Sequence, residues 1–144
     1  MIKKIVSKFK TVIRNPSIVI WKIKEWVDRN TDLQLKSKEF LEKQGVLLKK
    51  GDIKEHEFTC LKLANLYKLI QTRKPKVILE FGVGFSTIVL AAALKNNNDR
   101  YKQEGHLYTI DAQQHWLDNT ENKLQPELRQ YVTFHYSPLK KLNI

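Results

Sequence analysis

The sequence lacks several features that would by themselves assign it to a class of proteins. Its single cysteine, Cys60, excludes an internal disulfide framework and any metal site built on several cysteines. The longest apolar run near the start, residues 18–21, is far shorter than the roughly 20 residues that span a bilayer. The N-terminal segment also lacks the continuous apolar stretch and the small-residue cleavage site of a secretory signal. Together these absences predict a cytoplasmic protein.

The chain of 144 residues has a formal net charge of +11, and this charge is unevenly distributed. Residues 1–50 hold 13 Lys and Arg against 5 Asp and Glu, a net charge of +8. Residues 51–144 hold 13 against 10, a net charge of +3. The difference predicts two segments: a basic N-terminal region over residues 1–50, and a nearly balanced globular segment over residues 51–144.

The basic region is predicted to be helical. Apolar residues recur every three or four positions over residues 2–13, with lysines between them, and Pro16 suits the first turn of a second helix. Asp32 is expected to cap a third helix that ends near Gly45. The helices within residues 1–27 either pack on the protein or a partner, or lie on a membrane surface. Nucleic acid is a poorer candidate partner, because no zinc-finger spacing or recognisable helix-turn-helix accompanies the lysines.

The second segment alternates predicted helices and strands. Asp52 and Glu55 resemble a capping box for a helix that ends before Pro75. The elements that follow are a strand buried on both faces at 77–81, a helix at 87–94, a polar loop at 96–105, a strand at 107–111, a helix at 113–124 and a strand at 131–136. This order predicts an α/β fold: a Rossmann-like, doubly wound parallel sheet, of which only the first three strands are present.

The residues that carry chemistry lie where the first two strands end, which is where open α/β sheets bind ligands. The glycines of Gly82-Val83-Gly84 allow a ligand to approach the turn closely, and Ser86 is the expected N-cap of the next helix. Asp111 closes the second strand and is placed to accept hydrogen bonds from both hydroxyls of a ribose. The charge of Glu80 would repel a pyrophosphate and attract a cation. The sequence therefore predicts a ligand that contains adenosine and carries positive charge.

Other chemistries fit less well. A nicotinamide fingerprint requires a third small residue where Thr87 stands, and Glu80 further disfavours it. No Gly-Lys-Ser/Thr follows the strand, which excludes a P-loop. The four histidines have no shared metal-ligand spacing, so no metal site is predicted. Tyr67 and Tyr108 are expected in the core.

Residues 77–87 resemble the first motif of the class I S-adenosylmethionine-dependent methyltransferases, in the branch with Ser-Thr in place of the third glycine. Residues 108–111 and 114–117 are similar to the second motif and its helix, and residues 132–139 to the third strand and loop. The resemblance implies S-adenosylmethionine as cofactor, with Glu80 facing its ammonium group, Asp111 the ribose and Ala112 the adenine. The implied cofactor-binding residues are Glu80, Phe81, Gly82, Val83, Gly84, Ser86, Thr87, Asp111 and Ala112.

The resembled fold normally continues through four more strands, which supply most substrate contacts and often the catalytic base. No residue is therefore assigned a catalytic role. The branch of the family suggests a small-molecule or sugar hydroxyl as methyl acceptor. Without further strands, residues 77–81 form an open apolar edge, which predicts a truncated piece or self-association along that edge. The alternative function is a non-catalytic Rossmann-like module whose basic helices bind a membrane surface or a partner.

Overall fold

The computed structural model describes residues 32–46 and 60–138 of the chain. The predicted helices within residues 1–27 and the capping box at Asp52 and Glu55 lie outside these residues. The described elements are α3 (Asp32–Lys43), α4 (Cys60–Arg73), β1 (Val77–Phe81), α5 (Phe85–Tyr101), β2 (His106–Asp111), α6 (Gln114–Lys123), the 3-10 helix η1 (Pro126–Tyr131) and β3 (Val132–Tyr136). None of the described helices is both long and apolar enough to cross a bilayer.

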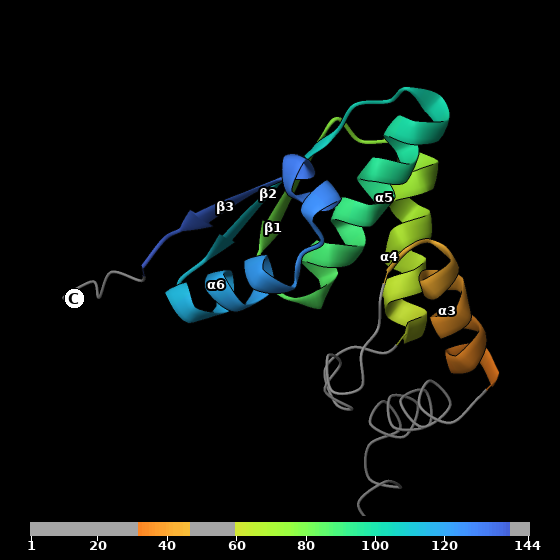
Figure 1. Ribbon diagram of the computed structural model, residues 1–144, viewed down its shortest axis with the longest axis horizontal. Coiled ribbons are helices and arrows are strands. Elements are labelled where there is room, and N and C mark those ends of the chain that lie inside the picture. Colours follow the sequence, from red (N-terminus) through yellow and green to blue (C-terminus); the bar gives the residue numbers. More distant parts are fainter. Residues whose placement is uncertain (1–31, 47–59, 139–144) are drawn as a thin grey trace, which may run out of the picture.

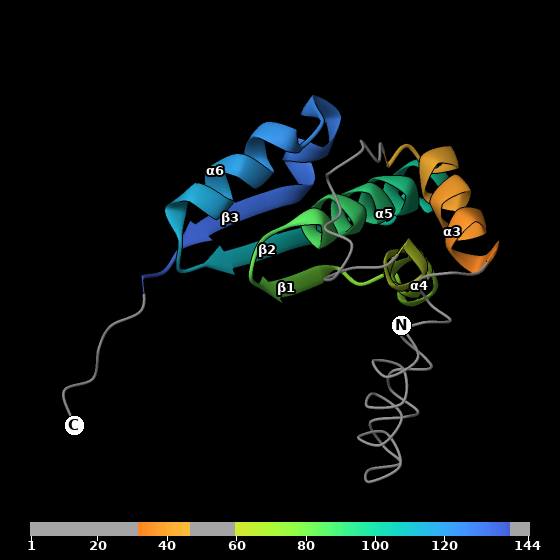
Figure 2. The same ribbon diagram turned by 90° about the horizontal axis from the view of Figure 1, so that it is seen from below.

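The three strands form one parallel sheet in the order β1-β2-β3 (Figure 1). The pairing places Glu80 opposite Thr109 and Asp111 opposite Tyr136. Helices α5 and α6, which connect the successive strands, lie on the same side of the sheet (Figure 2). This is the arrangement that right-handed crossovers give. The predicted fold class, the first three strands of a Rossmann-like sheet, is confirmed.

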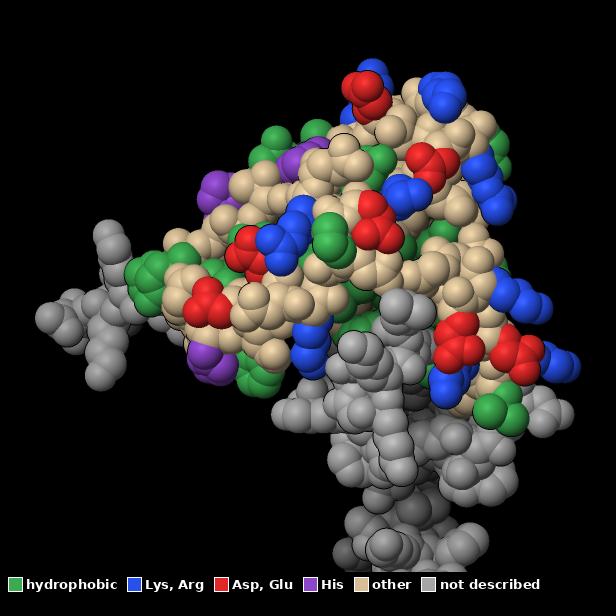
Figure 3. Space-filling view, viewed as in Figure 1, with side chains coloured by type: hydrophobic (Ala, Val, Ile, Leu, Met, Phe, Trp, Pro, Cys, Tyr) green, Lys and Arg blue, Asp and Glu red, His purple; other side chains and the backbone are tan. Residues whose placement is uncertain are grey.

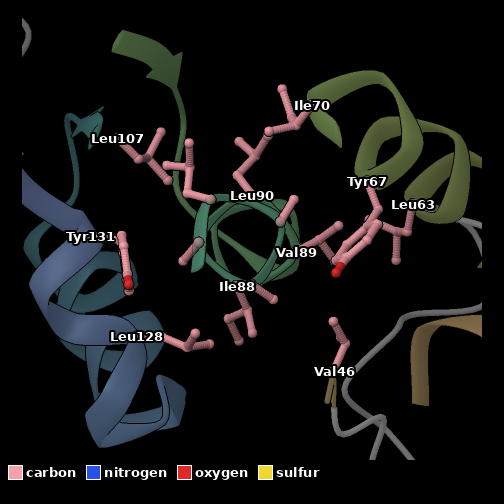
Figure 4. Packing of buried hydrophobic residues seen from close by; sticks show 14 of the residues in the cluster. Val46, Leu63, Tyr67, Ile70, Ile88, Val89, Leu90, Leu107, Leu128 and Tyr131 are labelled. Atoms are coloured by element: carbon pink, nitrogen blue, oxygen red, sulfur yellow. The ribbon is translucent and has the colours of Figure 1, made fainter. Parts of the chain in front are cut away.

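Helix α5 forms the centre of the core. It lies between α4 on one side and η1 on the other (Figure 4), and its residues Val89 and Leu94 are fully buried. From α4, Tyr67 is also fully buried and packs edge-on against Phe40 of α3, with ring centroids 5.5 Å apart. Burial raises the pKa of Tyr67 to about 12. The predicted core position of Tyr67 is therefore correct.

Helix α3 packs against α4 and ends as predicted. Leu41 is fully buried in the shared core, and Gly45 follows the helix with φ of 81°, a left-handed conformation that favours glycine. Basic and acidic side chains are interspersed over the face shown in Figure 3. No large area of one charge is seen on this face among the described residues.

Helix α5 is longer than predicted, because the asparagine run continues it where a polar loop was expected. Asn97 is only 1% exposed, and its Nδ2 donates a hydrogen bond to the carbonyl of Ile70 at 3.0 Å. The Oδ1 of Asn96 accepts one from Gln71 Nε2 at 2.7 Å. The helix then ends in a left-handed residue, Lys102, with φ of 54°. The polar side chains thus attach α5 to α4, and only the last part of residues 96–105 is loop.

The apolar sequence of β1 predicted burial on both faces of the sheet, and this prediction is wrong. Val77, Leu79 and Phe81 are 64%, 56% and 78% exposed, while Ile78 and Glu80 are partly buried toward the helices. The predicted core position of Tyr108 is also wrong, since it lies beside Leu79 on β2 and is 38% exposed. The reason is that no helix of the described part covers this face of the sheet (Figure 2).

Candidate functional site

The candidate site lies at the carboxyl ends of β1 and β2, around the glycine loop of residues 82–84. Gly82 leaves the strand with φ of 88°, a conformation that strongly favours glycine. Its amide donates to the carbonyl of Ile110 at 2.8 Å, which continues the pairing of β1 with β2 for one more residue. The turn into α5 therefore has a conformational need for glycine at position 82.

Gly84 has no such need. Its φ of 170° is ordinary extended backbone, and a Cβ atom placed on it would meet nothing within 4 Å. Neither the backbone nor the packing of the described residues thus requires glycine at this position. The open space at Gly84 is what close approach of a ligand to the loop would use.

Asp111, at the end of β2, ties the surrounding loops together. Its Oδ2 accepts a hydrogen bond from the amide of Val83 at 2.9 Å, and its Oδ1 accepts one from the amide of Gln113 at 2.8 Å. Its backbone carbonyl accepts one from the amide of Ser137 at 2.9 Å. The side chain is only partly buried, and each carboxylate oxygen can accept more than one hydrogen bond. The carboxylate can therefore take hydroxyl donors without releasing the loop.

Glu80 points toward the helix layer and is surrounded by hydroxyl groups. Its Oε1 accepts a hydrogen bond from Ser86 Oγ at 2.6 Å. Its Oε2 accepts one from Thr87 Oγ1 at 2.7 Å and another from Thr109 Oγ1 at 3.0 Å. Burial raises the pKa of Glu80, and the three hydroxyl groups counteract this rise because they stabilise the ionised form. The carboxylate is thus partly desolvated but well supplied with donors.

Ser86 is not the N-cap that the sequence predicted. Helix α5 begins at Phe85, and Gly84 occupies the N-cap position. Thr87 instead stabilises this end, because its Oγ1 accepts a hydrogen bond from the Gly84 amide at 3.1 Å while donating to Glu80. Ser86 lies in the first turn, where its hydroxyl is used by Glu80. The Ser-Thr pair therefore joins the glycine loop to the acid of β1.

The structure brings most of the predicted binding residues together at this edge of the sheet. Phe81 is the exception, since its side chain is 78% exposed on the uncovered face with Val77 and Leu79. Ala112 directly follows Asp111 and is partly buried. The described residues contain no group of three or more metal-ligating side chains. The sequence interpretation missed Thr109, although a polar residue at an inward position of a buried strand was a usable signal.

The comparison with family models agrees with this geometry. Residues 79–142 match a family described as a methyltransferase domain. The matched range contains Glu80, the glycine loop and Asp111. The match confirms the resemblance to class I S-adenosylmethionine-dependent methyltransferases that the motifs indicated. A comparison with curated proteins gives no match.

Two solved structures are similar to the chain. One is the O-methyltransferase TomG from Streptomyces achromogenes, which is involved in tomaymycin synthesis and was solved in complex with S-adenosylmethionine. It is 22% identical to this chain with a TM-score of 0.47, and the match covers 74% of this chain and 43% of TomG. The other is the methyltransferase PaMTH1 of Podospora anserina, bound to S-adenosylhomocysteine, with 14% identity, a TM-score of 0.47, and coverage of 83% and 49%. The chain thus spans less than half the length of each.

Proposed function

We propose that this chain, a methyltransferase by family resemblance, binds S-adenosylmethionine at the loop between β1 and α5 and is the cofactor-binding half of a methyltransferase. One observation carries the proposal: the Asp111 carboxylate lies against the Val83 amide, beside the open space at Gly84. An acid and an uncrowded glycine loop are thus joined directly. A suitable ligand has hydroxyl groups that donate to Asp111 and lies close to the backbone of the glycine loop.

Each described residue has a distinct part in this proposal. Asp111 would accept hydrogen bonds from the ribose hydroxyls, and Gly82 and Gly84 would leave room for the ligand along the turn. Glu80 would attract the ammonium group through its negative charge, with its oxygens held by the neighbouring hydroxyls. The bound cofactor would supply an electrophilic methyl group. The chain would contribute position and orientation, on which methyl transfer chiefly depends.

The acceptor we propose is a small-molecule or sugar hydroxyl, as the family branch suggests. No described residue is assigned to its binding or to proton removal. Incubation of the full chain with labelled S-adenosylmethionine and a panel of hydroxyl compounds, including sugars, tests this part separately. Labelling of carboxylate or amine compounds instead would contradict the hydroxyl class while leaving cofactor binding intact.

The test of cofactor binding is isothermal titration of the full chain with S-adenosylhomocysteine. We expect single-site binding, and we expect adenosine to bind better than 2′-deoxyadenosine because Asp111 accepts from the ribose. In Asp111→Ala this preference should disappear. Asp118→Ala is the matched control, because Asp118 is an exposed acid of α6 that accepts a hydrogen bond from Gln114 of the same helix. The absence of binding in the wild-type chain, or an unchanged ribose preference in Asp111→Ala, would contradict the proposal.

The uneven charge favours a second function for the N-terminal region. We propose that residues 1–27, with their lysines and recurring apolar positions, attach a cytoplasmic protein to the surface of anionic membranes. Sedimentation with anionic liposomes, with and without residues 1–27, tests this. Binding that is equal for both proteins, or absent at low salt, would contradict it. This function is compatible with cofactor binding and does not replace it.

A further inference from the structure

Thr109 is a buried polar residue whose hydroxyl has a specific use. The side chain is fully buried on β2, on the face of the strand that also carries Leu107 and Asp111. Burial of a hydroxyl group is unfavourable unless it is hydrogen-bonded, and a valine would fill the same space without this cost. The Thr109 hydroxyl donates to Glu80 Oε2 at 3.0 Å. The choice of threonine is therefore explained by Glu80 rather than by packing.

The three donors to Glu80 come from two different elements. Ser86 and Thr87 belong to the first turn of α5, whereas Thr109 lies directly opposite Glu80 in the pairing of β1 with β2. Thr109 is thus the contact that orients the carboxylate relative to the sheet. Two residues further along the same face of β2, Asp111 binds the glycine loop. One strand consequently fixes both acids of the candidate site.

We infer that Thr109 is a positioning residue of the candidate site, which holds the Glu80 carboxylate in place and keeps it ionised, and so sets the negative charge beside the glycine loop. The inference rests on the proposed function for its ligand, and on the hydrogen bonds above for its mechanism. A carboxylate that accepts from three hydroxyls is stabilised in its charged form. Loss of one donor would favour the neutral form and weaken attraction for a cation.

The surroundings of Glu80 make a clean test possible. The first turn of α5 carries no acidic residue, and the residues that face Glu80 there are Ser86 and Thr87. On β2, the nearest ionisable side chain on the same face is Asp111, whose oxygens are bound to the amides of Val83 and Gln113. A pH-dependent difference between wild type and a Thr109 variant would therefore report on Glu80.

The experiment compares the full-length wild type with Thr109→Val and Thr109→Ser. S-adenosylhomocysteine affinity is measured as a function of pH, with adenosine as the ligand that lacks the ammonium group. At neutral pH we expect Thr109→Val to weaken S-adenosylhomocysteine binding roughly tenfold, as for loss of a hydrogen bond to a charged group, and to leave adenosine little changed. As pH is lowered, the affinity of Thr109→Val for S-adenosylhomocysteine should begin to fall at a higher pH than that of the wild type. Thr109→Ser should restore the wild-type profile.

A second measurement keeps the inference testable if no ligand binds. Urea unfolding is followed across the same pH range for wild type, Thr109→Val and Thr120→Val, a matched change of another buried threonine, on α6. The stability lost in Thr109→Val should grow as pH rises and Glu80 ionises, whereas the effect of Thr120→Val should be independent of pH. A Thr109→Val effect that is equal at all pH values in both measurements would overturn the inference. Failure of the wild type to bind S-adenosylhomocysteine would instead count against the proposed function.

Discussion

The Asp111 carboxylate and the Val83 amide, 28 residues apart in the chain, form a hydrogen bond of 2.9 Å across the carboxyl ends of β1 and β2. The same carboxylate accepts the amide of Gln113 through its other oxygen. The acid that is proposed to bind a ribose is therefore also a structural part of the glycine loop and of the turn that follows β2. Any variant of Asp111 should be judged by both stability and ligand preference.

Replacement of Asp111 by alanine is expected to destabilise the chain even without ligand. It leaves the Val83 and Gln113 amides without their acceptor, which should lower the free energy of unfolding by about 1–2 kcal/mol. Asp118→Ala should change it by less than about 0.5 kcal/mol, because Asp118 is exposed. Urea unfolding at neutral pH measures both variants. Equal effects of the two substitutions would contradict the bridging role of Asp111.

The two loop glycines should respond differently to alanine. Gly82→Ala places a side chain in a left-handed conformation and should cost about 1–2 kcal/mol of stability. Gly84→Ala should leave stability unchanged or raise it by up to about 1 kcal/mol, because its backbone is extended and its surroundings are open. Only Gly84→Ala should then weaken S-adenosylhomocysteine binding without loss of stability. Denaturation and titration of both variants check this, and a Gly84→Ala chain that binds normally would argue against ligand contact there.

Glycine at position 105, directly before β2, is required by packing and not by contact with a ligand. A Cβ atom there would lie 2.6 Å from Leu94 Cδ2 and 2.6 Å from the carbonyl oxygen of Pro75. Leu94 is fully buried and the Pro75 oxygen is a backbone atom, so neither neighbour can move freely. Gly105→Ala should therefore lower the free energy of unfolding by about 1–3 kcal/mol. Differential scanning calorimetry should show a lower Tm, and a Tm equal to that of the wild type would show that this contact relaxes without cost.

The stability of the chain should depend on pH through Glu80. Burial raises its pKa above the ordinary value of 4.5, so the folded chain retains this proton to a higher pH than the unfolded chain. The contribution of protonated Glu80 to the free energy of unfolding is fully present below the pKa that this residue has in the unfolded chain. It is lost as pH rises through the higher pKa of Glu80 in the folded chain. Glu80→Gln cannot ionise and should lack this contribution. Urea unfolding between about pH 4 and about pH 8 should therefore show the wild type losing stability relative to Glu80→Gln. A constant difference would contradict the raised pKa.

The sequence predicted the parallel sheet and the location of the site because both depend on local signals. The bounds of β1 were correct, since Pro75 and Gly82 delimit a short apolar run, and Asp111 was placed by its position at the end of β2. The role of Asn97 was not predictable, because its burial depends on the Ile70 carbonyl of a separate helix. Side-chain orientation was also not predictable. The spacing of apolar residues could not show that Glu80 turns toward Thr109, or that Phe81 points away from the core.

The face of the sheet that no described helix covers should make the chain associate in solution. Leu79 and Phe81 are exposed on β1, which is also an edge strand of the described sheet and pairs there with β2 alone. We expect sedimentation velocity to show a weight-average sedimentation coefficient that rises with protein concentration. The double variant Leu79→Lys with Phe81→Lys should abolish this rise, because charged side chains protect an edge strand from pairing. Leu35→Lys is the matched control, since Leu35 is 64% exposed on α3, away from the sheet. A monodisperse wild-type monomer, or equal effects of both substitutions, would show that this face does not mediate the association.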